Sequence, residues 1–174
     1  VVDDKKKEAR VHFERGQKLV EEQAWEAALA EFLKSRETFP TRGNTQNAAV
    51  CLRKLHRFDE ALDLLERFDQ DFKEVPPQDR AAVDQEVKAL RALVGRIDVR
   101  VSEAGAAVRI DEKERGVAPL AGPVRVSAGS HLVRVFREGF LPFEQRVDVP
   151  GEGSVLVEAK LAALTQSGRL KVNE

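Results

Sequence analysis

Residues 23–29, QAWEAAL, and residues 56–62, HRFDEAL, decide the fold of the N-terminal half of this chain. An aromatic residue, an acidic residue and then Ala-Leu recur in them with a spacing of 33 residues. The small residues Gly16 and Ala49 are separated by the same spacing. A fixed period of this length is typical of an array in which each unit is a helix, a short turn and a second helix.

Five helices are predicted around these two stretches, from apolar residues that recur with the period of a helix. Pro40 ends the first pair, the tandem Pro76-Pro77 ends the second pair, and Gly95 closes the fifth helix. The predicted ranges are approximately 5–22, 25–38, 44–55, 58–72 and 78–94.

The two units resemble the tetratricopeptide repeat. Gly16 and Ala49 stand where that family has a small residue at the contact between its two helices. Pro40 closes the first unit as in the family, whereas the second unit lacks this proline and carries Phe68 where a small residue is usual. The resemblance implies two helical hairpins over residues 5–75 and a capping helix over residues 76–95. The alternative is an ordinary helical bundle.

The same resemblance implies that the first helix of each hairpin lines a concave groove for a protein or peptide partner. Some family members clamp a partner's C-terminal carboxylate with lysines and asparagines, and here only Asn47 matches those positions. The sequence therefore favours a mixed apolar and polar groove for a peptide or a helix. The alternative is a short groove that the fifth helix covers. The candidate groove residues are Phe13, Gln17, Val20, Gln46, Asn47, Val50 and Arg53.

Beyond Gly95 the pattern changes to valines that alternate with polar residues, with glycines and prolines between short runs. Short strands at near-regular spacing are typical of a small sandwich or barrel. A helical half followed by a strand half predicts an α+β fold with two segregated domains. The expected strands lie near residues 97–101, 108–110, 124–126, 133–135, 147–149 and 155–159.

The second half resembles the PEGA domain, a small β-sandwich-like module of bacterial envelope and signalling proteins. The resemblance depends on short motifs, among them GRIDV at 95–99, VRID at 108–111 and EGF at 138–140. The literal Pro-Glu-Gly-Ala string is absent, and Glu112 stands where glycine is common. The resemblance implies a small all-β sandwich over residues 96–162 that contacts a cell-surface polysaccharide. The candidate residues at its loop tips are Arg115, Arg137, Phe140 and Phe143.

Residues 168–172, GRLKV, repeat the pattern of residues 95–99, GRIDV. We therefore expect residues 163–174 to contain a linker and the first strand of a following β module. The alternative is a coincidental tail.

Composition and motifs argue against several classes of function. The chain has 29 Lys and Arg residues against 30 Asp and Glu residues, so charge gives it no general attraction to nucleic acid. It has no run of 18 apolar residues, which predicts no membrane-spanning segment. Its three histidines and its single cysteine, Cys51, lack the spacing of a metal site or of a nucleophile with its base. The sequence therefore predicts a protein that is not an enzyme and that has no metal and no cofactor.

The two resemblances together imply a non-catalytic scaffold or adaptor of the bacterial cell envelope. Its helical repeats would bind a protein partner, and its β region would contact a surface polymer. The periplasmic or envelope location comes from the resemblance alone. The alternative is an extracytoplasmic or regulatory segment of a larger signalling protein, such as a membrane-anchored kinase.

Overall fold

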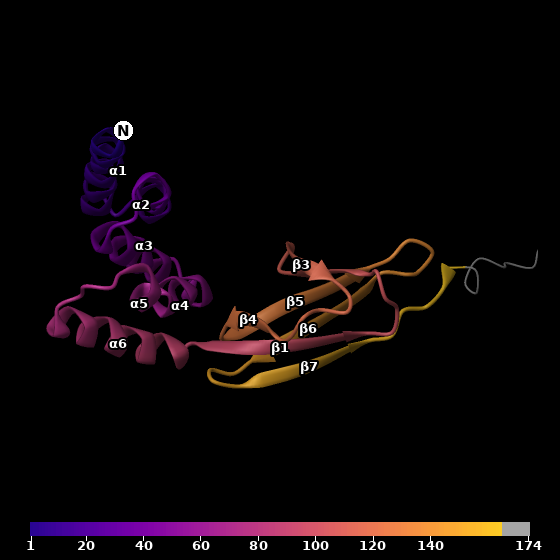
Figure 1. Ribbon diagram of the computed structural model, residues 1–174. Helices are drawn as coiled ribbons and strands as arrows, with labels where there is room; N and C mark the ends of the chain where they lie inside the picture. Colours follow the sequence, from indigo (N-terminus) through magenta and orange to yellow (C-terminus); the bar gives the residue numbers. More distant parts are fainter. Residues whose placement is uncertain (165–174) are drawn as a thin grey trace, which may run out of the picture. The chain divides into compact units, whose positions relative to one another are not determined.

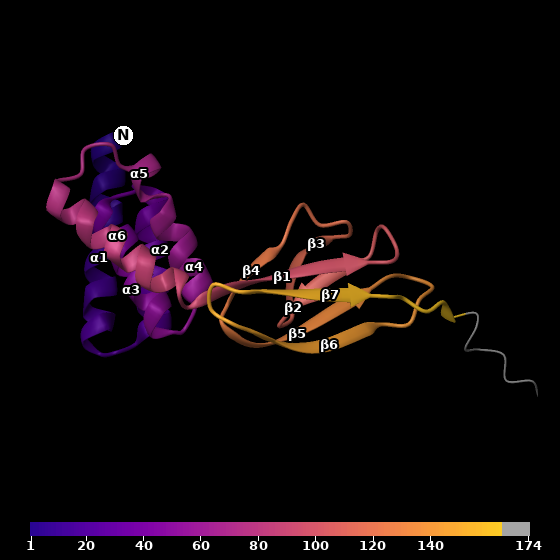
Figure 2. The same cartoon turned by 90° about the horizontal axis from the view of Figure 1, so that it is seen from below.

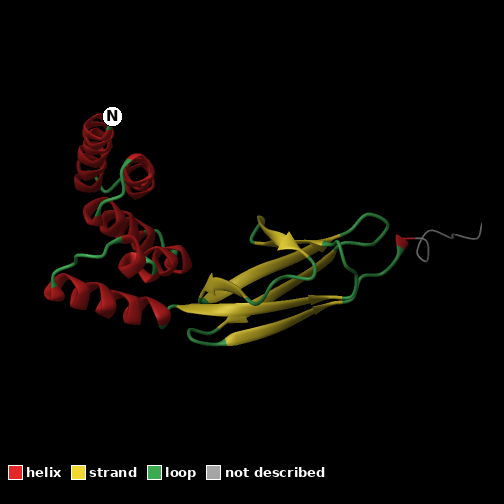
Figure 3. Cartoon of the chain, viewed as in Figure 1, coloured by secondary structure: helices red, strands yellow, loops and turns green. Residues whose placement is uncertain are grey.

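The computed structural model describes residues 1–164 and divides the chain into a helical unit, Val1–Leu93, and a β unit that begins at Val94. The helices α1–α6 precede the strands β1–β7 along the chain (Figures 1 and 3). The α+β organisation predicted from the sequence is confirmed. No helix in residues 1–164 combines the length and the apolar character that crossing a membrane requires.

Two helical hairpins open the chain. The first consists of α1 (Val2–Glu21) and α2 (Trp25–Thr38), and the second of α3 (Arg42–Lys54) and α4 (Phe58–Glu66). Each hairpin buries its apolar side chains between its own two helices, and α2 also packs against α3.

The turns of the two hairpins have the same conformation, 33 residues apart. Gln23 and His56 both adopt a left-handed backbone conformation with φ of 58°. The residue after each turn donates its amide to the helix that precedes it, from Ala24 to Leu19 O (2.9 Å) and from Arg57 to the corresponding Leu52 O (2.8 Å). The sequence repeat therefore corresponds to a repeat of local structure, in which each helix ends on the same C-terminal cap.

The first hairpin depends on a close approach between its two helices at Gly16. A Cβ atom placed on Gly16 would lie 2.7 Å from Cε1 of Phe32. The Phe32 ring is 0% exposed and packs against Phe13, with 5.6 Å between ring centroids. The small residue is therefore required for packing, since a larger one would have to displace a buried ring.

The fourth predicted helix, 58–72, is interrupted. The helix α4 ends at Glu66, and Phe68–Asp71 form a separate short helix, α5. Phe68 is 1% exposed and its ring lies 5.0 Å from that of Phe72. A bulky residue at this position therefore accompanies a bend after Glu66, which turns the ring into the core.

The last helix, α6 (Pro77–Arg91), packs against α4, as Figure 2 shows. Its proline occupies the first helical turn, where the missing amide proton costs nothing. Its apolar residues Val83 and Leu90 are buried. Arginine–carboxylate ion pairs connect α6 to the rest of the helical unit: Arg42–Asp79 (3.0 Å), Arg53–Glu86 (2.5 Å), Arg80–Asp69 (3.5 Å) and Arg91–Glu66 (3.2 Å).

The predicted boundary between helix and strand differs from the observed one. The expected fifth helix extended to 94 and the capping segment to 95, but α6 ends at Arg91 and Val94 already begins β1. A side chain at Gly95 would collide with Val149 and with Pro150 O, which would lie 2.5 Å from its Cβ. Gly95 therefore admits the close approach of the β6–β7 turn to β1 instead of ending a helix.

The β unit is a sandwich of two sheets. One sheet has the order β4-β1-β7 and the other the order β3-β2-β5-β6. The pair β1–β7 is parallel and the other pairs are antiparallel. Valines from both sheets, such as Val99, Val108 and Val133, form one buried core. The strands are β1 (Val94–Val101), β2 (Ala107–Ile110), β3 (Lys113–Val117), β4 (Val124–Ser127), β5 (Gly129–Phe136), β6 (Phe143–Val149) and β7 (Ser154–Ala159).

The strand β3 was not predicted from the sequence. Its residues are Lys-Glu-Arg-Gly-Val, and it lies at the edge of its sheet with mostly exposed side chains. An edge strand of this kind carries no alternating apolar pattern, because no face of it is fully buried.

The end of the described chain is fastened to the β5–β6 connection. Leu141 N donates to Ala162 O (2.8 Å), and Leu164 N donates to Gly139 O (2.9 Å). The strand predicted at 168–172 lies outside the described residues.

Candidate functional site

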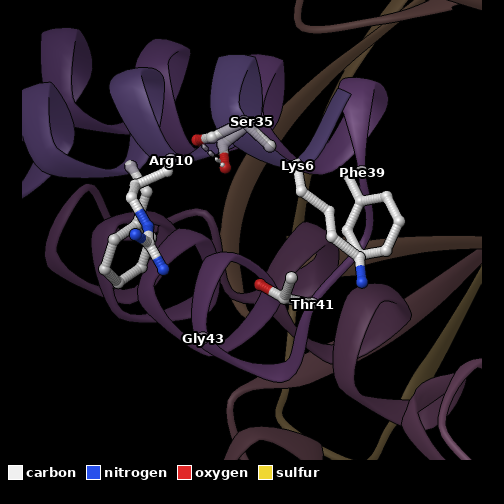
Figure 4. Close-up of a pocket in the computed structure, with 8 residues that line it drawn as sticks. Lys6, Arg10, Ser35, Phe39, Thr41 and Gly43 are labelled. Carbon is white, nitrogen blue, oxygen red and sulfur yellow. Dashed lines mark hydrogen bonds between the residues drawn. The ribbon is translucent and has the colours of Figure 1, made fainter. Parts of the chain in front are cut away.

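Two hollows on the helical unit are lined in part by predicted groove residues. The larger, about 270 Å³, lies where α1, the end of α2 and the start of α3 meet. Figure 4 shows Lys6 beside Phe39 on one side of it and Arg10 on the other, with Thr41 and Gly43 below them. We call it the Phe13 hollow, and its lining residues are Lys6, Ala9, Arg10, Phe13, Ser35, Phe39, Thr41 and Gly43.

The uncharged polar side chains around the Phe13 hollow form hydrogen bonds within the protein. The Ser35 hydroxyl donates to Ala9 O (2.8 Å), and Thr41 Oγ1 accepts from Asn44 N (3.1 Å). The buried Asn44 side chain donates in turn to Phe39 O (2.9 Å). Thr41 and Asn44 form a reciprocal capping box, which fixes the start of α3 and therefore the edge of the hollow.

The second hollow, about 200 Å³, lies between α3, α4 and α6. Val50 lies on it and is 49% exposed, whereas Ala49 and Leu52 of the same helix are buried. We call it the Val50 hollow, and its lining residues are Gln46, Ala49, Val50, Leu65, Ala82, Val83 and Glu86.

The structure divides the predicted groove residues into three groups. Phe13 lines the first hollow, and Gln46 and Val50 line the second. Arg53 and Asn47 are engaged within the helical unit, because Arg53 pairs with Glu86 and Asn47 donates to Gly43 O (2.8 Å).

Gln17 and Val20, the remaining two predicted groove residues, line neither hollow.

The basic residues beside the first hollow were not predicted from the sequence. Lys6 and Arg10 precede Phe13 by seven and three residues, so helical period places all three on one face of α1. They were missed because they precede or begin the repeat unit. A further cavity of about 230 Å³, lined by Asp3, Lys6, Lys7 and Arg10, adjoins the hollow through Lys6 and Arg10.

The candidate residues of the β unit do not gather at one loop tip. Arg137 and Phe140 lie in the β5–β6 connection, with the Arg137 guanidinium 5.5 Å from the centroid of the Phe140 ring. Arg115 instead lies within β3, and Phe143 begins β6 and packs against the core. Arg115 therefore belongs to an edge strand and not to a loop tip, and Phe143 is partly buried against the core of the sandwich.

Histidines join elements in both units. His12 is buried in α1 with Nδ1 2.7 Å from Oε2 of Glu31 on α2. In the β unit, His131 on β5 faces two acceptors, with Nδ1 2.5 Å from Asp111 Oδ2 and Nε2 2.5 Å from Ser127 O. Both histidines therefore hold neighbouring elements together.

Asp111 lies in the tight turn between β2 and β3, where Asp111 and Glu112 have φ of 51° and 66°. Burial by itself would raise the pKa of Asp111, but the hydrogen bond from the Leu132 amide and the bond and charge of His131 outweigh it and hold the pKa below its ordinary value. Two successive left-handed residues favour glycine, which explains why glycine is common at the position of Glu112.

Two further features bear on reactivity, the single thiol and the spacing of the side chains that could bind a metal. Burial raises the pKa of the Cys51 thiol, which keeps it protonated and unreactive at neutral pH. Within residues 1–164, no three His, Cys, Asp or Glu side chains lie close enough together to hold a metal ion.

Comparison with known families supports the reading of the β unit. The family model of the PEGA domain matches residues 94–164, which begin at the first residue of β1 and end at the last described residue. No tetratricopeptide family match supports the reading of the helical unit. A search of curated proteins found no match to the chain.

Proposed function

We propose that this protein is a non-catalytic interaction scaffold of the bacterial cell envelope. The helical unit binds a protein partner on the face that carries the two hollows, and the β unit contacts a surface polymer. The similarity of residues 94–164 to the PEGA domain supports an extracytoplasmic, envelope-associated location. The tetratricopeptide-like repeat of the hairpins supports a role in protein binding.

The observation that carries the proposal is the Val50 hollow. Its walls come from α3, α4 and α6, and apolar atoms dominate them. Val50 leaves 49% of its surface exposed beside Ala49, Leu65 and Val83, which are all buried. An exposed apolar side chain at the edge of an apolar concavity is what an anchoring contact with a partner requires.

The protein-binding part is tested by retention of envelope proteins on the immobilised whole chain. Val50→Glu places a charge on the hollow, whereas Leu33→Glu makes the same change on α2 at a residue that is 41% exposed and lines neither hollow. We expect Val50→Glu to abolish retention of a partner that Leu33→Glu retains. Equal retention by both variants would contradict the proposal.

The polymer-binding part is tested by co-sedimentation of the whole chain with purified cell-wall polymer. Arg137→Glu reverses the charge that lies over Phe140 in the β5–β6 connection. Arg96→Glu is the control, because Arg96 is an exposed residue near the start of β1, where it is paired with Ser154 at the start of β7. We expect sedimentation with the polymer to depend on Arg137 and not on Arg96. Failure of the unmodified chain to sediment with the polymer would contradict this part.

A further inference from the structure

We propose that the Phe13 hollow and the basic residues beside it bind an acidic peptide segment that inserts one bulky apolar side chain. This inference deepens the proposed function, on which it rests, by naming the chemistry of the partner. It commits to a peptide of aspartate and glutamate residues around a leucine, isoleucine or phenylalanine.

The size and walls of the hollow fit one side chain. Its volume of about 270 Å³ is below the usual range of pockets that enclose a whole small molecule or cofactor. Ala9, Phe13 and Phe39 supply apolar surface around it. The Ser35 hydroxyl already donates to Ala9 O, and Thr41 Oγ1 already accepts from Asn44 N. The apolar walls therefore favour an apolar group of the ligand.

The charges around the hollow specify the residues that flank this group. Lys6, Lys7 and Arg10 come together along the first turns of α1 and line a cavity that adjoins the hollow. None of them forms an ion pair with a carboxylate in residues 1–164, although the Lys6 ammonium lies over the Phe39 ring at 5.4 Å. Asp3 is the one carboxylate that lines the cavity.

Three arginines elsewhere in the helical unit are paired with carboxylates, unlike these basic groups. Arg36 pairs with Asp71 (2.9 Å), Arg42 with Asp79 (3.0 Å) and Arg53 with Glu86 (2.5 Å). Arg10 has no such carboxylate, so its positive charge remains available to a ligand. A ligand that supplies carboxylates beside the hollow would gain favourable electrostatic interactions and faster association.

A peptide fits this site better than an anionic lipid surface does. The apolar walls are sunk into a concavity between α1 and α3, whereas a flat bilayer would meet the charges and leave the concavity unfilled. An extended chain can place one side chain in the hollow and its neighbours against Lys6 and Arg10, because successive residues of an extended chain are about 3.3 Å apart.

The test measures fluorescence anisotropy of labelled nonapeptides with the whole chain. The first peptide contains aspartate and glutamate around a central leucine, the second has glycine in place of the leucine, and the third has glutamine in place of every acid. We expect the first to bind at least about tenfold more tightly than either of the others, because each lacks one of the two contributions. Binding of the first peptide should also weaken when the salt concentration is raised from 0.05 to 0.5 M, because the Debye screening length falls from about 14 to about 4 Å.

Variants of the chain locate the site. Gly43→Leu fills the hollow, and it should fold, since a Cβ at Gly43 lies 3.5 Å from the Phe13 ring at ordinary contact distance. Arg10→Glu reverses a charge beside the hollow, and Arg15→Glu makes the same change at an exposed position of α1 that lines neither the hollow nor the adjoining cavity. We expect Gly43→Leu and Arg10→Glu each to weaken binding at least about tenfold, and Arg15→Glu to change it less than about twofold.

Several results would overturn the inference: no binding of the leucine peptide, equal binding of the leucine and glycine peptides, or equal effects of Arg10→Glu and Arg15→Glu. Vesicles of anionic phospholipid could also displace the peptide. If they do so equally well from the parent and from Gly43→Leu, the basic residues bind a membrane surface instead. If the peptide test fails but retention of an envelope protein still depends on Val50, this inference is wrong and the proposed function stands. If neither peptide binding nor Val50-dependent retention is observed, both this inference and the proposed function are rejected.

Discussion

Replacing Gly16 with alanine tests how closely α1 and α2 pack in the first hairpin. The added Cβ would lie 2.7 Å from Cε1 of Phe32 and 2.9 Å from two further atoms of that ring. Carbon atoms at favourable contact are about 3.5–4.0 Å apart, so the helices or the ring must move by most of an ångström. Phe32 is fully buried and also packs against Phe13, which leaves the ring no free space.

The expected magnitude follows from two opposing effects. Overpacking a filled core typically costs about 1–3 kcal/mol, and glycine to alanine in a helix interior gains about 1 kcal/mol. Because the ring that the Cβ meets is rigid and buried, the cost lies at the upper end of its range. We therefore expect Gly16→Ala to lower the free energy of unfolding of the helical unit by about 1–2 kcal/mol. Gly43→Ala, whose Cβ meets ordinary contacts, should raise it by up to about 1 kcal/mol.

The assay is urea unfolding followed by the fluorescence of Trp25. This is the one tryptophan of the chain, and it begins α2, so its signal reports the helical unit separately from the β unit. The midpoint should fall for Gly16→Ala and rise for Gly43→Ala, with similar slopes for both variants. A Gly16→Ala protein as stable as the parent or more stable would refute the argument that Phe32 and Gly16 are in close contact.

Three further predictions concern the β unit. Gly95→Ala should destabilise the β unit by more than about 3 kcal/mol, because the added Cβ meets the backbone of the β6–β7 turn. Amide hydrogen exchange in β1 and β7 should accelerate, and unchanged exchange would contradict the prediction. Glu112→Gly should stabilise the unit by up to about 1 kcal/mol, because glycine adopts the left-handed conformation of this turn position without strain. Amide hydrogen exchange in β2 and β5 should become slower, and faster exchange would be the contrary result. Asp111→Asn should remove a pH dependence of the stability of the β unit. The lowered pKa of Asp111 gives stability that is present above the unfolded value of about 3.9 and is lost as the pH falls through the folded pKa. In the parent, the NMR shift of the Leu132 amide should titrate with a midpoint below about 3.9, and a midpoint above it would contradict the assignment.

The helical repeat could be predicted from the sequence because the same local chemistry recurs in it. The aromatic-acid-Ala-Leu pattern marks the start of α2 and of α4, and the turns before them adopt one conformation at Gln23 and His56. The break after Glu66 could not be predicted from periodicity, because the apolar pattern continues through Phe68. The helix breaks there because the ring of Phe68 is buried in the core.

The strands were predicted where valines alternate and missed where they do not. Central strands such as β5 bury every second residue, and that pattern is visible in the sequence. The edge strand β3 buries almost nothing, so its pairing with β2 depends on the turn at Asp111 and Glu112 and not on apolar period.

The hollows could be predicted only in part. Phe13, Gln46 and Val50 followed from the resemblance, since first helices line the concave face of such arrays. The remaining walls come from other elements, such as Ser35 and Phe39 at the end of α2. The spacing of residues along one helix cannot indicate which residues of a neighbouring helix approach it, so these contacts required the structure.

The most direct test of the account is site-specific photo-crosslinking in living cells. A photoreactive residue is placed at Val50 in one form of the whole chain and at Leu33 in another, because the two side chains have similar exposure on different helices. We expect a discrete crosslinked protein partner from position 50 and none from position 33. A partner captured equally from both positions, or from position 33 alone, would contradict the claim that the hollowed face of the helical unit is the binding surface.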